Sequence, residues 1–370
     1  MTTLFSPVRV GALALAHRVV LAPLTRLRAG EEGVPTDLMA EYYGQRTSMG
    51  GLLITEATTV AVTGRGYLGA PGLYNEAQVA GWRKVISAIH DKGGKIFAQL
   101  WHVGRVSHVE MTGGEAPVTA SAVRFEGVAF TRNGWVPVSP ARALLFKEIP
   151  AIIEAFRQAA ERAREAGFDG VELHAANGYL LDQFLQDGSN QRTDSYGGSI
   201  ENRAQLLLKV TEAVASVWGD GRVAVRISPS SAFNEMHDSD PTALFGYVAE
   251  QLNRFKLAYL HVVEPRVKGS ELIEEGAAPV AAAWLRSIFT GTIVAAGGFE
   301  PRDAEAAVFD GIADLVAFGR HFIANPDLPR RLELGLPLNP YDRATFYGGT
   351  EKGYTDYPFF HKEEALLAAR

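Results

Sequence analysis

The stretch KEIPAIIEAFRQAAERAREAGFDGVELH, residues 147–174, contains the pattern that decides the fold. Apolar side chains recur at helical spacing over Lys147–Gly167, and Gly167 is a typical helix end. The stretch closes with GVELH, residues 170–174, a short strand whose side chains alternate between apolar and polar. A helix followed at once by a buried strand is the unit that parallel sheets repeat.

The same unit recurs along the chain. The candidate strands are Val19–Leu24, Gly51–Thr55, Lys95–Trp101, Gly170–His174, Arg222–Ser228, Ala258–Val263, Thr292–Ala296 and Ala313–Phe318. Strand and helix alternating eight times predict an α/β protein, a single (β/α)8 barrel domain over residues 1–370. An open doubly wound sheet is the alternative, but no Gly-x-Gly-x-x-Gly follows the first strand.

Two segments lie outside this repeat. Residues 4–18 are expected to form an N-terminal hairpin that turns near Gly11 and could plug the N-terminal end of the barrel. Residues 103–146 are a long insertion after the third strand, and within it the Asn133-Gly134 pair predicts a second hairpin. Connections of this length are commonly lids or binding loops, so we expect a lid here.

Composition excludes several classes of function. The 370 residues include no cysteine, which removes disulfides, thiolate metal sites and cysteine nucleophiles. Since no His, Asp and Glu set has ligand spacing either, we expect no metal. The formal charge of −6 gives no reason to bind nucleic acid or a membrane. The N-terminus resembles no signal peptide and no apolar run is long enough to span a bilayer, so a cytoplasmic protein is expected.

Arg226 is the first candidate functional residue. In RVAVRIS, residues 222–228, the apolar positions share one face, so Arg226 should point into the barrel near its mouth. A buried arginine is costly unless it meets an anion or an electron-rich acceptor. It could serve a ligand, or it could form a structural ion pair with Glu172 or Glu56.

A second group follows the strand at residues 170–174. His174 ends that strand, Asn177 comes three residues later, and Gly178 gives the backbone freedom to present Tyr179. Two neutral donors aimed at one oxygen would stabilise a developing negative charge, and a tyrosine hydroxyl can deliver a proton. The alternative is a satisfied histidine followed by a turn-forming Asn-Gly pair.

Other strand ends indicate where a cofactor would lie. Glycines and an arginine follow the last two strands, where barrels often bind phosphate; plain turn glycines are the alternative. A planar heterocycle could rest on polar groups of the first, third and fifth strands. The phosphate candidates are Gly297, Gly298, Gly319 and Arg320, and the planar part would be held by Thr25, Gln99 and Arg226, with Trp101 beside Gln99.

Several motifs together resemble the Old Yellow Enzyme family of FMN-dependent ene-reductases. They include APLTR (22–26), LLITEAT (52–58), AQLWHVGR (98–105), GVELHAANGYLLDQFL (170–185) and RTDSYGGSIENR (192–203). The resemblance extends from Leu4 to about Pro358 and looks closest to the branch of N-ethylmaleimide reductase and pentaerythritol tetranitrate reductase.

The resemblance implies a role for each matching residue. Noncovalent FMN would be held by Pro23, Leu24, Thr25, Ala57, Gln99, Arg226, Gly297, Gly298, Gly319 and Arg320. His174 and Asn177 would bind the activating oxygen of the substrate, and Tyr179 would be the proton donor. The pocket above the flavin would be lined by Tyr67, Trp101 and Tyr347.

The implied activity is reduction of activated alkenes such as enones, enals, maleimides and nitroalkenes, with nitro compounds and nitrate esters as further substrates. NADPH or NADH would reduce FMN and leave, N5 would pass a hydride to the alkene, and Tyr179 would protonate it. Phenols would bind as inhibitors, and the protein would be a monomer or homodimer. The rival hypotheses are another FMN barrel dehydrogenase and a flavin-containing sensor.

Overall fold

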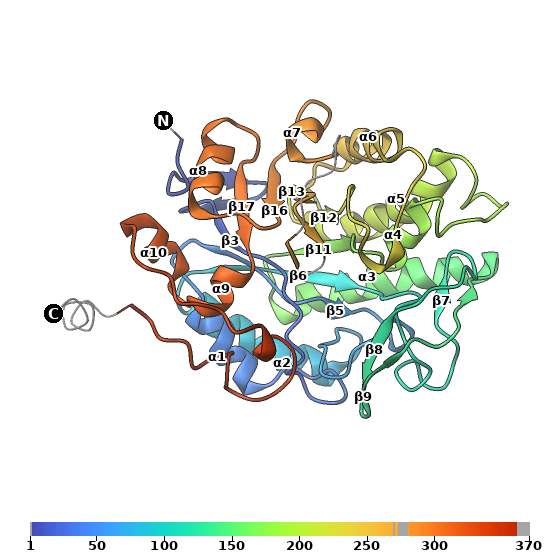
Figure 1. Cartoon of the computed structure of the whole chain (residues 1–370), viewed down its shortest axis with the longest axis horizontal. Helices are drawn as coiled ribbons and strands as arrows, with labels where there is room; N and C mark the ends of the chain where they lie inside the picture. Colours follow the sequence, from blue (N-terminus) through green and yellow to red (C-terminus); the bar gives the residue numbers. More distant parts are fainter. Residues whose placement is uncertain (1, 269–270, 273–279, 361–370) are drawn as a thin grey trace.

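Eight parallel strands close into a barrel in the computed structural model, which describes residues 2–268, 271–272 and 280–360 (Figure 1). Each strand pairs with its neighbours in chain order, and β11 pairs with β6 to complete the ring. This arrangement confirms the predicted (β/α)8 barrel. The barrel strands are β3 (Val19–Leu21), β4 (Leu52–Ile54), β6 (Lys95–Trp101), β11 (Gly170–Ala175), β12 (Val223–Ile227), β13 (Tyr259–Val263), β16 (Ile293–Ala296) and β17 (Leu315–Phe318).

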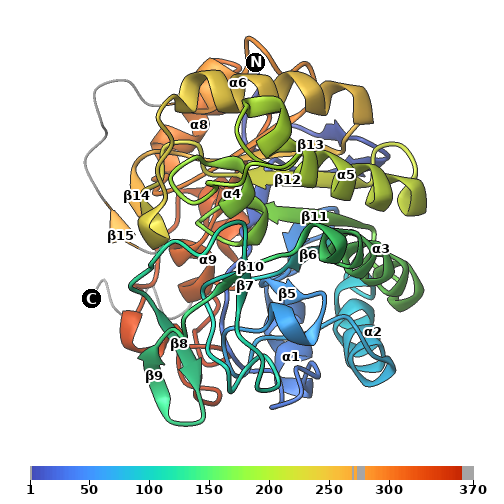
Figure 2. The ribbon, with the colours of Figure 1, turned by 90° about the vertical axis from the view of Figure 1, so that its right-hand side faces the viewer.

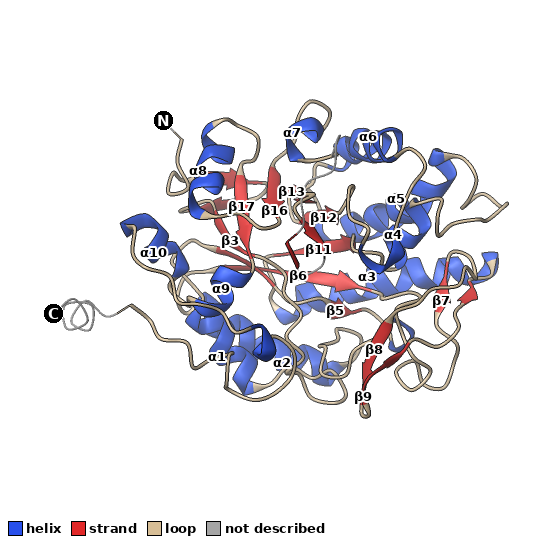
Figure 3. Ribbon diagram, in the orientation of Figure 1, coloured by secondary structure: helices blue, strands red, loops and turns tan. Residues whose placement is uncertain are grey.

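Helices surround the ring of strands, as Figure 3 shows. α3 ends at Gly167, whose φ of 101° is left-handed, and α5 begins after Ser199, whose side chain accepts a hydrogen bond from the Asn202 amide. The helices are α1 (Asp37–Gln45), α2 (Glu76–His90), α3 (Ile149–Ala166), α4 (Leu180–Leu185), α5 (Ile200–Trp218), α6 (Pro241–Leu252), α7 (Ala282–Leu285), α8 (Pro301–Phe309), α9 (Arg320–Ala324) and α10 (Leu328–Leu334).

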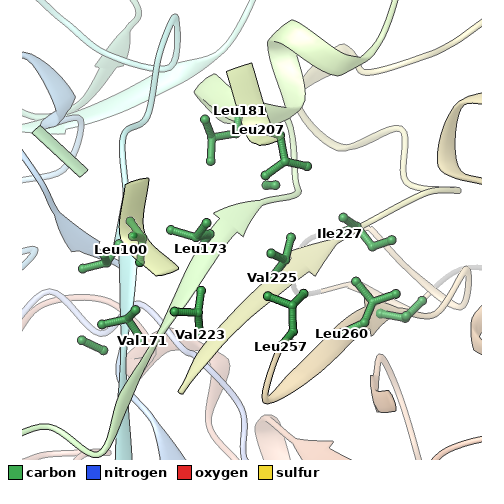
Figure 4. Close-up of a cluster of buried hydrophobic side chains, with 14 of the residues drawn as sticks. Leu100, Val171, Leu173, Leu181, Leu207, Val223, Val225, Ile227, Leu257 and Leu260 are labelled. Atoms are coloured by element: carbon green, nitrogen blue, oxygen red, sulfur yellow. The ribbon is translucent and has the colours of Figure 1, made fainter. Parts of the chain in front are cut away.

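The two faces of each strand belong to different layers of the core. Val171, Leu173, Val225 and Ile227 point outward and pack with the helices, a layer seen in Figure 4. Their alternate neighbours point into the barrel. This alternation is the reason why polar residues such as Glu172 and Arg226 face the barrel interior.

The N-terminal hairpin closes the amino-terminal end of the barrel. Its strands β1 (Val8–Val10) and β2 (Leu13–Leu15) are antiparallel, and the apolar side chains of Val10, Leu13 and Leu15 join the cluster of barrel-interior residues. Gly11, with a φ of 52°, turns so tightly against Gly221 that a Cβ atom would lie 2.3 Å from the Gly221 carbonyl oxygen. The sequence prediction of a plug is therefore confirmed.

The insertion after β6 carries the second predicted hairpin. Its strands β8 (Val128–Thr131) and β9 (Gly134–Pro137) are antiparallel and project at the edge of the molecule (Figure 2). The two turn residues are Arg132 and Asn133, one position earlier than predicted, because Gly134 already pairs with Thr131. β7 (Val118–Thr119) and β10 (Arg142–Ala143) pair in parallel at the base of the insertion.

The remaining elements are short. They are β5 (Thr58–Thr59), β14 (Val267–Lys268), β15 (Glu271–Leu272) and the 3₁₀ turns Val62–Gly64, Phe146–Glu148, Phe233–Glu235, Asn253–Phe255 and Arg343–Thr345. Over the described part of the chain, no helix has the length and apolarity that crossing a membrane requires.

Candidate active site

A cavity of about 670 Å³ lies at the carboxyl-terminal ends of the barrel strands. Because all eight strands are parallel, their ends bring residues from distant parts of the chain to one mouth. The predicted site residues that line the cavity are Pro23, Leu24, Thr25, Tyr67, Gln99, His174, Asn177, Tyr179, Arg226, Gly297, Gly298, Gly319, Arg320 and Tyr347.

Two predicted residues, Ala57 and Trp101, are not among those that line this cavity. Trp101 is completely buried, and the ring of Tyr67 stacks on it at a centroid distance of 5.6 Å. Ala57 belongs to the same apolar cluster as Trp101. Strand alternation correctly places Trp101 on the inner face of β6, but it does not reveal that Tyr67 and Tyr179 would cover it.

Glycines shape one end of the cavity. Gly297 and Gly298 follow β16 with φ values of 117° and 67°, conformations that disfavour any side chain. A Cβ atom at Gly297 would lie 3.2 Å from the Glu264 amide nitrogen, and one at Gly319 would lie 3.1 Å from Leu24. Backbone and ligand can therefore approach closely here.

Arg320 follows Gly319 at the same end. Its Nη1 atom is buried and forms no hydrogen bond within the described residues. A buried guanidinium N–H without a partner is costly, and an anionic group in the cavity would satisfy it. Together with the glycines, Arg320 makes this end suited to a phosphate.

The floor of the cavity holds a second arginine with unused hydrogen-bonding capacity. Arg226 pairs in register with His174 on β11, and its Nε atom is buried without a partner in the described chain. Burial lowers the pKa of Arg226, and the nearby charge of Glu172 opposes that shift. Arg226 forms no ion pair with any of the described residues. The alternative interpretation, a structural salt bridge with Glu172 or Glu56, is therefore wrong.

His174 ends β11 beside Arg226. Burial lowers the pKa of His174 well below its usual value, and the positive charge of Arg226 adds to the effect. The imidazole is therefore neutral at pH 7. Its Nδ1 atom is buried and has no hydrogen-bond partner in the described residues.

Asn177 and Gly178 form a left-handed turn after β11, with φ values of 57° and 74°. The Asn177 amide donates to the Ser228 hydroxyl over 2.7 Å, which fixes the turn against the end of β12. The turn brings the side chains of Asn177 and Tyr179 to the same cavity as His174. The three predicted groups thus converge, as the strand-end pattern predicts.

Tyr179 is the third of the predicted side chains at this part of the cavity. Burial raises its pKa well above 10, and the neighbouring Tyr67 hydroxyl raises it further. Its ring lies edge-on to the rings of Trp101 and His174, at centroid distances of 4.9 and 5.0 Å. Tyr179 therefore holds its proton at physiological pH and has a fixed orientation.

Asn234 lines the same cavity, and the sequence assigns it no role. It adopts a strained left-handed conformation with φ of 58°, and its Nδ2 atom donates to the Asn177 carbonyl oxygen over 2.8 Å. Its side chain also influences the nearby Tyr179 hydroxyl and partly offsets the rise in the pKa of Tyr179. No sequence pattern marks this contact, because 57 residues separate Asn177 from Asn234.

Trp135, from hairpin β8–β9, was also not predicted. It lines the cavity, and its ring lies 5.9 Å from the rings of both Tyr67 and Tyr347. The lid hairpin thus supplies an aromatic wall at the mouth.

Buried arginines hold the loop that carries Tyr347. Arg26 and Arg28 donate hydrogen bonds mainly to backbone carbonyls of the C-terminal segment. Arg46 donates one such bond, and its others go to Tyr42, Gln45, Phe322 and Ile323. The acceptors in that segment are the carbonyl oxygens of Thr345, Phe346, Thr350, Lys352, Gly353 and Tyr354. The Gly348 amide donates back to the Arg26 carbonyl over 2.9 Å. Side chains of the segment contribute as well, because the buried ring of Tyr354 stacks on Tyr42 at a centroid distance of 4.0 Å and lies against the guanidinium groups of Arg26 and Arg28.

The described part of the chain contains no group of three or more His, Asp or Glu side chains that could hold a metal ion. One end of the cavity, with its glycines and Arg320, suits an anion, and Arg226 offers a donor on the polar floor. The remaining polar groups are the neutral His174, the amide of Asn177 and the protonated Tyr179.

Comparison with known proteins shows that this chain is an oxidoreductase of the class that combines a barrel fold with a flavin. The NADH:flavin oxidoreductase / NADH oxidase family matches residues 3–339. The chain belongs to this family, which includes Old Yellow Enzyme.

Individual relatives match over nearly their full length. The chain is 45% identical to flavin oxidoreductase hxnT of Emericella nidulans, over 96% of this chain and 97% of that protein. It is 47% identical to 12-oxophytodienoate reductase 1 of Oryza sativa subsp. japonica, over 97% and 93% of the two chains.

Solved structures agree with this membership. Morphinone reductase in complex with tetrahydroNAD superposes with a TM-score of 0.92 at 47% identity, over 98% of this chain and 99% of that chain. The Old Yellow Enzyme homologue from Zymomonas mobilis gives a TM-score of 0.93 at 43% identity, over 97% and 100%.

Proposed function

We propose that this protein is an FMN-dependent ene-reductase that uses NADPH or NADH to reduce the C=C bond of activated alkenes. The observation that carries the proposal is the convergence of His174, Asn177 and Tyr179 on one cavity with Arg226 and Arg320. Enones, enals, maleimides and nitroalkenes are the substrate class, with nitro compounds and nitrate esters as further acceptors. The 103–146 segment would act as the lid of this one barrel domain.

The residues present fit FMN. Arg320 and the glycines that follow β16 and β17 would hold its phosphate, since Arg320 Nη1 is buried without a partner. Gln99 and Arg226 would hold the pyrimidine edge, and the segment Pro23–Thr25 would lie along the ring system. When bound, FMN supplies hydride transfer from the nicotinamide to the alkene.

The chain's own groups would activate the substrate. His174 and Asn177 would donate hydrogen bonds to the carbonyl or nitro oxygen of the alkene, which polarises the C=C bond. Because burial keeps His174 neutral, the charge that develops on that oxygen meets two neutral donors. Preorganised donors of this kind typically accelerate a reaction about 10²- to 10³-fold each.

Tyr179 would deliver the proton to the α-carbon. Its raised pKa keeps the hydroxyl protonated, and the edge-on contacts with Trp101 and His174 fix the direction of its ring. Tyr67 itself, with its pKa raised by burial to about 12, remains protonated and can pass a proton to Tyr179.

We also propose that the protein belongs to the branch of N-ethylmaleimide reductase and pentaerythritol tetranitrate reductase, which motifs such as GVELHAANGYLLDQFL, residues 170–185, resemble. The relatives named above include reductases of 12-oxophytodienoate and of morphinone. Their named substrates support a reductase of conjugated carbonyl compounds here.

The deciding experiment uses the purified protein reconstituted with FMN. The visible spectrum should show bound flavin, anaerobic NADPH or NADH should bleach it, and 2-cyclohexenone should restore it. An apoprotein that does not bind FMN, or a reduced form that the enone does not reoxidise, would refute the proposal.

A further inference from the structure

A buried carboxylate lies directly behind the polar floor of the cavity. Glu172, on β11, is completely buried and accepts a hydrogen bond from Gln99 Nε2 over 2.7 Å. Its other oxygen lies 2.9 Å from His261 Nδ1 on β13, and the side chain of His261 is also completely buried. Glu172 therefore connects three strands of the barrel beneath the cavity.

The charges of this pair follow from their surroundings. Burial would raise the pKa of Glu172, but His261, Arg226 and Gln99 outweigh it and the pKa is lowered, so the carboxylate is ionised. Burial lowers the pKa of His261, which is therefore neutral. An ionised carboxylate only accepts, so His261 carries its proton on Nδ1 and donates it to Glu172.

The hydrogen bond to Glu172 decides what Gln99 presents to the cavity. With Nε2 engaged by the carboxylate, the amide oxygen of Gln99 is left as an acceptor for a ring N–H. Arg226, whose Nε atom lacks a partner in the described chain, is left as a donor. Glu172 thus stands behind both groups expected at the pyrimidine edge of a flavin.

We propose that Glu172 is a positioning residue that orients Gln99 and, as a fixed buried negative charge, lowers the reduction potential of the bound flavin. This inference rests on the proposed function. Two-electron reduction adds negative charge to the pyrimidine ring, which Arg226 attracts and Glu172 repels. In the dry barrel interior such a charge is weakly screened, so its removal should be measurable.

The test is the midpoint potential of the FMN complex of Glu172→Gln, whose amide oxygen can still accept from Gln99. We expect FMN to bind and the reduced form to gain at least about tenfold over the oxidised form. That gain corresponds to a rise of about 30 mV for a two-electron couple. Arg226→Ala should shift the potential in the opposite direction.

Two further variants separate charge from structure. Asp169→Asn removes a carboxylate just before the same strand, where it accepts from the Ile96 amide over 3.0 Å at the other end of the barrel, and should leave the potential unchanged. Glu172→Asp retains the charge and should remain within about threefold of the wild-type ratio. Differential titration of apoprotein with FMN gives the affinity of each variant independently.

Three outcomes would overturn the inference. They are an unchanged potential in Glu172→Gln, equal shifts in Glu172→Gln and Glu172→Asp, and loss of FMN binding in both while Asp169→Asn binds normally. Failure of the proposed function looks different, because the wild-type protein would then not bind FMN or not pass electrons to an enone.

Discussion

The surroundings of Tyr179 restrict both its orientation and its protonation state, more than those of any other site residue. Its ring is fixed between Trp101 and His174, and its hydroxyl keeps its proton because burial raises its pKa. We predict that Tyr179→Phe slows the enone half-reaction by about two to four orders of magnitude, the usual worth of general acid catalysis. Reduction of flavin by the nicotinamide should stay nearly unchanged, since that step needs no proton from Tyr179.

Stopped-flow measurement of each half-reaction checks this prediction. Nitroalkenes provide an internal control, because their reduced anion is stable enough to be protonated by water. Equal slowing of both half-reactions would show that Tyr179 acts in binding or structure. No slowing of either would show that another group, such as water, is the acid.

His174 and Asn177 supply the second prediction. His174→Ala and Asn177→Ala should each weaken the binding of a phenol, because the phenolate oxygen would accept from both side chains. Each variant should also slow enone reduction roughly 10²- to 10³-fold. Because His174 is neutral, phenol affinity should follow the titration of the phenol and show no step near pH 6.5. Spectral titration from pH 5.5 to 9 measures both effects, and unchanged affinity in both variants would contradict the assignment.

The individual site residues were predictable to different degrees. Strand alternation identifies Gln99, His174 and Arg226 as inward-facing, and the structure places all three at the cavity. It also places Trp101 on the inner face of β6, but it does not reveal that Tyr67 covers this ring, because period-two patterns do not encode side-chain packing. The contact of Asn234 could not be predicted because its partner is a backbone carbonyl in another strand–helix unit.

Among the elements, the N-terminal hairpin gives the clearest prediction. Leu13 is buried with residues of the barrel interior, so Leu13→Ala should leave a cavity there. Leu→Ala changes at such positions cost about 2–5 kcal/mol of unfolding free energy. The matched control is Arg9→Ala in the paired strand, whose exposed side chain should contribute less than about 0.5 kcal/mol. Urea unfolding measures both; similar losses would show that the hairpin does not plug the barrel.

The barrel strands were predictable because each is a short apolar run bounded by polar or glycine residues, followed by a helical pattern. The short pairs β7–β10 and β14–β15 were not, since two-residue strands carry no periodicity. The turn of hairpin β8–β9 differed from prediction by one residue. An Asn-Gly pair allows two arrangements here: Gly134 can be a central residue of the turn, or it can be the first residue of the following strand, as it is in the structure.

At the scale of the whole molecule, buried ionisable groups determine how stability varies with pH. Glu56 is completely buried, and burial raises its pKa from 4.5 to about 7 despite the amides of Arg26 and Leu27, which donate to it. Between these values the folded protein holds a proton that the unfolded chain has lost. This group therefore stabilises the fold below pH 4.5, and that contribution is lost as the pH rises through about 7.

We predict that Glu56→Gln removes this loss. The shift of 7 − 4.5 = 2.5 units corresponds to about 3 kcal/mol, so the variant should lose about that much less stability than wild type between pH 4.5 and 8. His17 and His102, with pKa values lowered by burial to about 4 and 3, act in the opposite direction in both proteins. Denaturant unfolding across this pH range gives the unfolding free energy of both proteins as a function of pH. The difference between the two curves is the contribution of Glu56, and parallel curves would contradict the prediction.

The hydrogen bonds that Arg26, Arg28 and Arg46 donate to the C-terminal segment have a consequence for evolution. Arg26, Arg28 and Arg46 donate to carbonyl oxygens, which every amino acid possesses, so these hydrogen bonds do not depend on the side chain at position 347. Tyr347 can therefore be exchanged without loosening its support. A lineage could retune its preference among alkenes by altering this one position, and a library randomised at Tyr347 should yield folded variants at nearly the parental frequency.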